Sequence, residues 1–150
     1  MHAIAGSGAG FLLAVLWFDL MFDMQVRGHA ADHDLPEAVR ASISGYYARV
    51  TIAARPMNRL IALVMLVTVG AMGGLVLRGD LSLWRAVPAF VLTVVAVGIA
   101  AVRTVRNAMR LGRRTDEAAR QSQLARSIRR DHFVELGAIV TALVLLLLPA

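Results

Sequence analysis

The 150-residue sequence contains no cysteine and no lysine, and charged residues make up only 17% of it. Without cysteine the chain forms no disulfide framework, holds no thiolate-bound metal and uses no thiol nucleophile. The scarcity of charge and the abundance of apolar residues exclude a disordered, solvating segment. All sixteen basic residues are arginine, and against ten acidic residues they give a formal net charge of +6.

Hydrophobic residues make up 58% of the chain and its mean hydropathy is +0.65, whereas a soluble domain is about 45–50% apolar. Four apolar stretches account for the excess, at about residues 4–24, 58–78, 86–106 and 132–149. Each approaches the roughly 20 residues that an α-helix needs to cross a bilayer. Spanning helices also satisfy their own backbone hydrogen bonds. We therefore predict an all-α integral membrane four-helix bundle that forms one domain over residues 1–150.

The arginines predict which ends of these helices face the cytoplasm. Fourteen of the sixteen lie in segments 25–59 and 103–131, whereas the turn at 78–85 has two and the termini have none. Because basic segments stay on the cytoplasmic side, both long segments are expected there, with the N- and C-termini outside. The expected location is a bacterial inner membrane. Since topology explains the basic charge, we expect no nucleic-acid binding.

Short helices are expected in both cytoplasmic segments. Apolar side chains that recur at helical spacing around Pro36 predict an amphipathic helix at the membrane surface: Leu35, Val39, Ile43 and Tyr46 or Tyr47. Thr115 predicts the N-cap of a second helix, which runs through Leu124 and Ile128 into the fourth span. Gly112 is the expected break between that helix and an extended third span.

Three acidic residues lie within the predicted spans, where ionisable side chains are costly and usually have a partner or a function. Asp19 and Asp23 share one face of the first helix, which Arg27 continues, and Glu135 follows His132 by three residues. The charges within the first span also make a cleaved signal peptide unexpected.

Two interpretations of these acidic residues are open. In the first, the carboxylates neutralise neighbouring arginines as structural ion pairs. In the second, they face an intramembrane cavity as proton acceptors or metal ligands. Asp19, His132 and Glu135 are then the candidate catalytic residues and also the candidate ligands of a metal. The sequence does not identify a cofactor.

Further polar residues lie near the cytoplasmic ends of the spans. Arg103, Arg106 and Asn107 fall on one stripe of the third helix. This stripe either contacts anionic lipid headgroups or binds a carboxylate or phosphate inside the bundle. Asn58 is placed for an interhelical hydrogen bond, and Arg59 for reaching the headgroups. The candidate ligand-binding residues are Asp23, Asn58, Arg59, Arg103, Arg106 and Asn107.

Arg55 and Asn58 resemble part of a motif in the glutathione-dependent membrane enzymes of eicosanoid metabolism. Those enzymes also have four spans, outside termini and an arginine-rich cytoplasmic side, but Ile61 stands here at the position of their motif glutamate. The string from Pro56 to Asn58 is similar to one in anthrone-oxygenase-like small membrane proteins. Each resemblance covers a handful of residues, and no functional residue is carried over from either family.

The polar residues all map to the cytoplasmic third of their spans, so a bundle brings them together. We expect this cluster to bind, and in an enzymatic version to transform, a lipophilic or amphipathic small molecule. The alternative is a non-catalytic subunit or assembly factor of a larger membrane complex, in which the charges form interhelical pairs. Membrane lipids are expected partners in both cases, and a homo-oligomer is the remaining open possibility.

Overall fold

The computed structural model describes residues 1–29 and 34–149, and this part of the chain contains helices and no strand. Its α-helices are α1 (His2–Asp23), α2 (Glu37–Tyr47), α3 (Arg55–Arg78), α4 (Leu83–Ile99), α5 (Val105–Arg113) and α6 (Ala118–Leu147). The prediction of an all-α chain is therefore confirmed.

Three shorter helical segments extend or join these helices. A 3-10 segment, Met24–His29, continues α1, and a π-helical segment, Ala48–Ala53, continues α2. A second π-helical segment, Ala100–Thr104, joins α4 to α5, so that one unbroken helix runs from Leu83 to Arg113. The wider turns of π-helical segments are frequent at functional sites.

Three helical stretches among the described residues are long and apolar enough to cross a membrane: His2–His29, Arg55–Arg78 and Leu83–Arg113. They contain the predicted spans 4–24, 58–78 and 86–106. The fourth predicted span, 132–149, lies largely in α6, which is 30 residues long. That helix is not one of the three, since Arg130, Asp131 and Glu135 lie where its apolar half begins.

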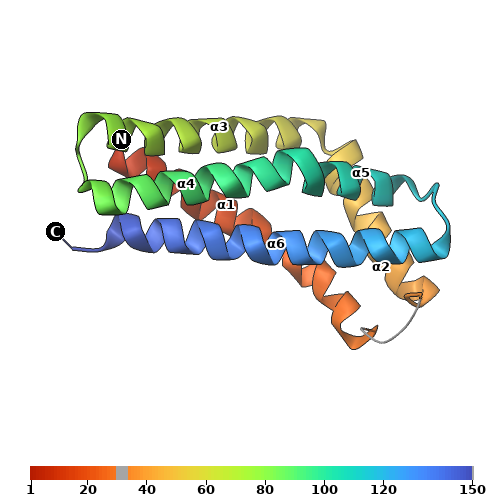
Figure 1. Ribbon diagram of the computed structural model, residues 1–150. Coiled ribbons are helices and arrows are strands. Elements are labelled where there is room, and N and C mark those ends of the chain that lie inside the picture. The colour runs from red at the N-terminus through yellow and green to blue at the C-terminus, as the bar shows by residue number, and fades with distance from the viewer. Residues whose placement is uncertain (30–33, 150) are drawn as a thin grey trace.

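The long helices pack in a ring. α1 contacts α3 and α6, and α4 contacts the same two helices from the other side. Figure 1 shows α3, α4 and α6 running alongside one another while α1 crosses behind them. Both ends of the chain lie at the end of the molecule that carries the α3–α4 turn, and α2 and α5 lie at the opposite end (Figure 1).

Apolar side chains pack between the helices in three clusters. The cluster nearest the termini includes Ala5, Leu75 and Leu146, and the next includes Leu12 and Ile139. A third cluster lies at the opposite end, under α2: Val26, Leu35, Ile43, Tyr47, Ala108, Leu111, Leu124, Ala125 and Ile128. The helix α2 therefore forms where an amphipathic helix was predicted, and its apolar face packs against α5 and α6 within the protein.

The connection between α5 and α6 differs from the prediction in two details. The helix does not break at Gly112, because α5 continues to Arg113, and Arg114 ends it with a φ of 53°. Gly112 serves close packing instead, since a Cβ there would lie 2.8 Å from the backbone nitrogen of Ala48. The N-cap of α6 is Glu117 rather than Thr115.

Arg85 stabilises the other end of α6. Its side chain is buried, and its guanidinium donates to the carbonyl oxygens of Leu145 at 3.0 Å and Leu146 at 3.3 Å, and also to that of Leu148. The last carbonyls of a helix lack intrahelical partners and carry partial negative charge, so a buried arginine there satisfies both needs.

Candidate functional site

A cavity of about 700 Å³ lies among the long helices. Residues of α1, α3 and α6, of the segment from Tyr46 to Ala54 and of the segment from Ala96 to Met109 line it. Most of its wall is apolar and includes Phe11, Val15, Ile61, Met65, Val97 and Ile139. Its size and lining are typical of a small-molecule site.

Polar side chains from several helices also line this cavity. They are Asp19, Tyr46, Tyr47, Thr51, Asn58, Thr104, His132 and Glu135. The structure therefore brings the three candidate catalytic residues, from α1 and α6, to one cavity. No arginine is among the lining residues in the described part of the chain.

His132 lies against two carboxylates of α1. Its Nδ1 is 2.6 Å from Asp23 Oδ2, and its Nε2 is 3.8 Å from Asp19 Oδ2. Asp23 and His132 are both buried. Because Asp19 and Asp23 are one helical turn apart, both side chains face α6. A carboxylate on Nδ1 orients an imidazole ring and leaves Nε2 for proton exchange, here on the side of Asp19 and the cavity.

Two tyrosines of α2 donate hydrogen bonds to these carboxylates. The Tyr46 hydroxyl donates to Asp19 Oδ1 at 2.6 Å, and the Tyr47 hydroxyl donates to Asp23 Oδ1 at 2.7 Å. The Tyr46 ring also stacks on Phe22, with 3.9 Å between the ring centroids. Burial, together with the neighbouring carboxylates, raises the pKa of both tyrosines above the ordinary value, so both stay protonated donors.

Glu135 has one satisfied and one open oxygen. The Thr104 hydroxyl, at the end of the π-helical segment Ala100–Thr104, donates to Glu135 Oε1 at 2.5 Å. Only 3% of Glu135 is exposed, yet the residue lines the cavity. Within the described residues, Oε2 has no hydrogen-bond or ion-pair partner.

The ion-pair interpretation does not describe the acids of the spans. No arginine of the described residues lies within ion-pair distance of Asp19, Asp23 or Glu135; these acids contact hydroxyls and an imidazole instead. The neighbouring acid that does pair with arginine is Asp131, which lies 3.1 Å from the half-exposed Arg103 and 3.8 Å from Arg130.

The remaining candidate ligand-binding residues are dispersed. Asn58 lines the cavity, where its Nδ2 donates to the Thr51 carbonyl at 2.9 Å. Arg59 and Arg106 are exposed, and Asn107 is half-buried and does not line the cavity. Asp23 is hydrogen-bonded to His132 Nδ1 and does not line the cavity either.

The metal candidates meet at the cavity but do not form a ligand set. Within the described ranges no group of three or more His, Asp or Glu side chains is placed to hold a metal ion. Asp19 is instead held by Tyr46, and Glu135 by Thr104. The arrangement as it stands favours hydrogen bonding and proton exchange.

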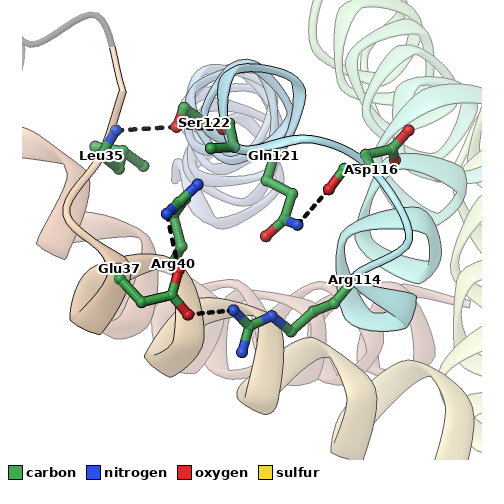
Figure 2. A network of polar contacts seen from close by, with 8 residues as sticks. Leu35, Glu37, Arg40, Arg114, Asp116, Gln121 and Ser122 are labelled. Atoms are coloured by element: carbon green, nitrogen blue, oxygen red, sulfur yellow. Dashed lines mark hydrogen bonds and ion pairs between the residues drawn. The ribbon is translucent and has the colours of Figure 1, made fainter.

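A network of polar contacts holds the beginning of α2 in place (Figure 2). Glu37, at the start of α2, accepts hydrogen bonds from Arg40 at 2.8 Å and from Arg114. The hydrogen bond from Arg114 lowers the pKa of the Glu37 carboxyl. The backbone N–H of Leu35 donates to the Ser122 hydroxyl at 2.9 Å. These contacts tie the beginning of α2 to α6 and the α5–α6 connection, and thereby position the two tyrosines at its end.

Sequence reasoning missed the tyrosines and Thr104 as site residues. Tyr46 and Tyr47 are the only tyrosines of the chain, and helical periodicity places them on the apolar face of a surface helix without a role for their hydroxyls. The available signal in the sequence was a pair of adjacent hydroxyl-bearing side chains on the apolar face of the predicted helix. No comparable signal marked Thr104, because its position depends on the π-helical segment before it.

No protein-family model matches the chain, and comparisons with curated proteins and with solved structures also find no match. The function is therefore inferred from the cavity and its side chains.

Proposed function

We propose that this chain binds, and transforms by proton transfer, a lipophilic or amphipathic small molecule in the cavity. The observation that carries this proposal is the combination of a largely apolar cavity of about 700 Å³ with Asp19, His132 and Glu135 on its wall. Burying ionisable groups is costly, and such groups in a cleft are candidates for function.

The proposal places the cavity inside a four-span bundle of the bacterial inner membrane. Large apolar side chains of α1, α3 and α6 that do not line the cavity are exposed, as expected for lipid contact: Trp17, Leu63, Leu66, Phe133 and Val144. In this arrangement residues 132–149 provide the fourth span. Segments 25–59 and 103–131 are cytoplasmic, as their arginines favour, and both termini are outside.

The proposed chemistry divides three roles among the ionisable residues: orienting the imidazole, transferring the proton and binding the ligand. Asp23 orients His132 through Nδ1, and His132 accepts or donates a proton at Nε2. Asp19 and Glu135, which line the cavity from α1 and α6, bind the polar end of the ligand. The hydrocarbon part of the ligand occupies the apolar wall.

Filling the cavity tests this proposal. Ala100 lines the cavity and is buried, so Ala100→Phe places a ring inside it. The matched control is Gly98→Phe on the same helix, since Gly98 is exposed and a Cβ placed on it would meet no atom within 4 Å. The protein is purified in nanodiscs formed from native lipids. Lipophilic molecules are then extracted from these nanodiscs and identified by mass spectrometry.

We expect wild type and Gly98→Phe to enrich the same compound over the bulk membrane, and Ala100→Phe to lose that enrichment. Enrichment that survives in Ala100→Phe, or its absence from wild type, would contradict ligand binding in the cavity.

The second candidate function is a non-catalytic subunit or assembly factor of a larger membrane complex. Gly10, Gly70 and Gly98 have no neighbouring atom within 4 Å of a Cβ placed on them, so close approach of a partner helix is open at these positions. Purification in a mild detergent separates the two functions. A stoichiometric larger partner supports the subunit, and a lone chain or homo-oligomer supports the ligand site.

A further inference from the structure

The charge on the cavity wall restricts the head group of a ligand. The acidic residues that line it, Asp19 and Glu135, are accompanied by His132 and by no arginine of the described chain. Arg103, expected to hold an anionic group, instead pairs with Asp131 and is half exposed. An anionic head group would therefore meet two carboxylates in a region of low dielectric, where repulsion between like charges is strong.

The open hydrogen-bonding capacity of the wall consists mainly of acceptors. Asp19 Oδ1 accepts from Tyr46, but Asp19 Oδ2 lies 3.8 Å from His132 Nε2, which is too long for a hydrogen bond. Glu135 Oε2 has no partner among the described residues, although only 3% of the residue is exposed. A ligand that donates hydrogen bonds and carries positive charge fits these oxygens, because it favours the ionised carboxylates, which only accept hydrogen bonds.

We propose that the cavity selects a lipophilic amine, whose ammonium group lies between Asp19 and Glu135 and whose hydrocarbon part lies against α3 and α4. An ammonium group supplies three donors and one positive charge to the two open carboxylate oxygens. The apolar residues of the opposite wall, such as Ile61, Met65 and Val97, cover the hydrocarbon part. This inference rests on the proposed function and adds the class of ligand to it.

Matched photoreactive probes test the selectivity. Three probes carry the same diazirine-bearing alkyl chain and end in an amine, an alcohol or a carboxylic acid. The full chain in nanodiscs of one lipid composition is irradiated with each probe, and labelled peptides are mapped by mass spectrometry. We expect labelling of cavity-lining residues to be about tenfold stronger with the amine than with the acid, a difference of about 1.4 kcal/mol, and intermediate with the alcohol.

Variants tie this selectivity to the carboxylates. Asp19→Asn combined with Glu135→Gln is expected to remove the preference for the amine while the alcohol still labels the cavity. Asp80→Asn, in the exposed turn after α3, is the matched control and should keep the wild-type preference. If the double variant does not fold, each single substitution is measured in its place.

The outcomes separate this inference from the function on which it rests. Labelling of the cavity by the acid as strongly as by the amine overturns amine selectivity but leaves lipophile binding in place. Failure of all three probes to label cavity residues in wild type overturns both. Selectivity that persists in the variants shows that the two carboxylates do not cause it and also overturns the inference.

Discussion

At the scale of single residues, Asp23 is the most constrained group of the site. It is completely buried, and its two oxygens lie 2.7 Å from the Tyr47 hydroxyl and 2.6 Å from His132 Nδ1. A buried carboxylate without such partners would be strongly unfavourable. Asp19 has an equivalent tyrosine, but 16% of its side chain is exposed and it faces the cavity.

This difference predicts unequal effects for two matched substitutions. Tyr47→Phe is expected to lower the free energy of unfolding by about 1–3 kcal/mol, because a buried carboxylate oxygen loses its donor. Tyr46→Phe is expected to lower it less, since water in the cavity can replace the lost hydroxyl at Asp19. Unfolding in a mild detergent measures both variants. Equal losses, or a larger loss for Tyr46→Phe, would contradict the expectation that the more buried carboxylate depends more strongly on its tyrosine.

At the scale of elements, the position of α2 depends on its close approach to α5. Gly112 of α5 lies against the backbone of Tyr47 and Ala48, where α2 passes into its π-helical extension. The tyrosine hydroxyls reach α1 from that same end of α2. Packing at Gly112 therefore helps to determine the geometry of a site formed by other helices.

Adding one methyl group at Gly112 tests this dependence. Gly112→Ala would place its Cβ 2.8 Å from a backbone nitrogen, and backbone has to move to accommodate it. We expect a loss of about 1–3 kcal/mol, as for other overpacked sites. Gly137→Ala is the control, because its Cβ meets no atom within 4 Å and alanine favours the helix. A Gly112→Ala protein as stable as the Gly137→Ala protein would contradict the close contact.

At the scale of the whole molecule, the ring of long helices separates two chemically different ends. The end with the α3–α4 turn also carries both ends of the chain (Figure 1). The other end carries α2, α5 and the first half of α6, where most of the arginines lie. This segregation is the basis of the proposed orientation in the membrane.

The natural absence of cysteine makes this orientation directly testable. Ser82→Cys lies in the turn before α4, and Gln123→Cys lies on the polar half of α6; both native residues are exposed. In spheroplasts, which lack the outer membrane but keep a sealed inner membrane, a membrane-impermeant maleimide is expected to label Ser82→Cys. Gln123→Cys should react only after the inner membrane is permeabilised. The opposite pattern would invert the proposed topology.

The sequence predicted the elements better than their contacts. Long apolar stretches require backbone hydrogen bonds within each segment, so the helices and their approximate bounds follow from composition and periodicity. The meeting of Asp19, His132 and Glu135 at one cavity was also expected from the sequence, because all three map to the same side of their predicted spans. The roles of Tyr46, Tyr47 and Thr104 do not, because they depend on how α2 and the π-helical segment pack.

The sequence by itself determined that the chain is helical, apolar and charged at one end, because these properties depend on local composition. Only the tertiary structure decided the contacts, such as the one between Asp23 and His132, which are 109 residues apart. Periodicity defines which residues share one face of a helix, but packing of all the helices determines how each is rotated toward its neighbours. That rotation turns Asp19 and Glu135 toward the cavity and leaves Arg103 and Arg106 outside it.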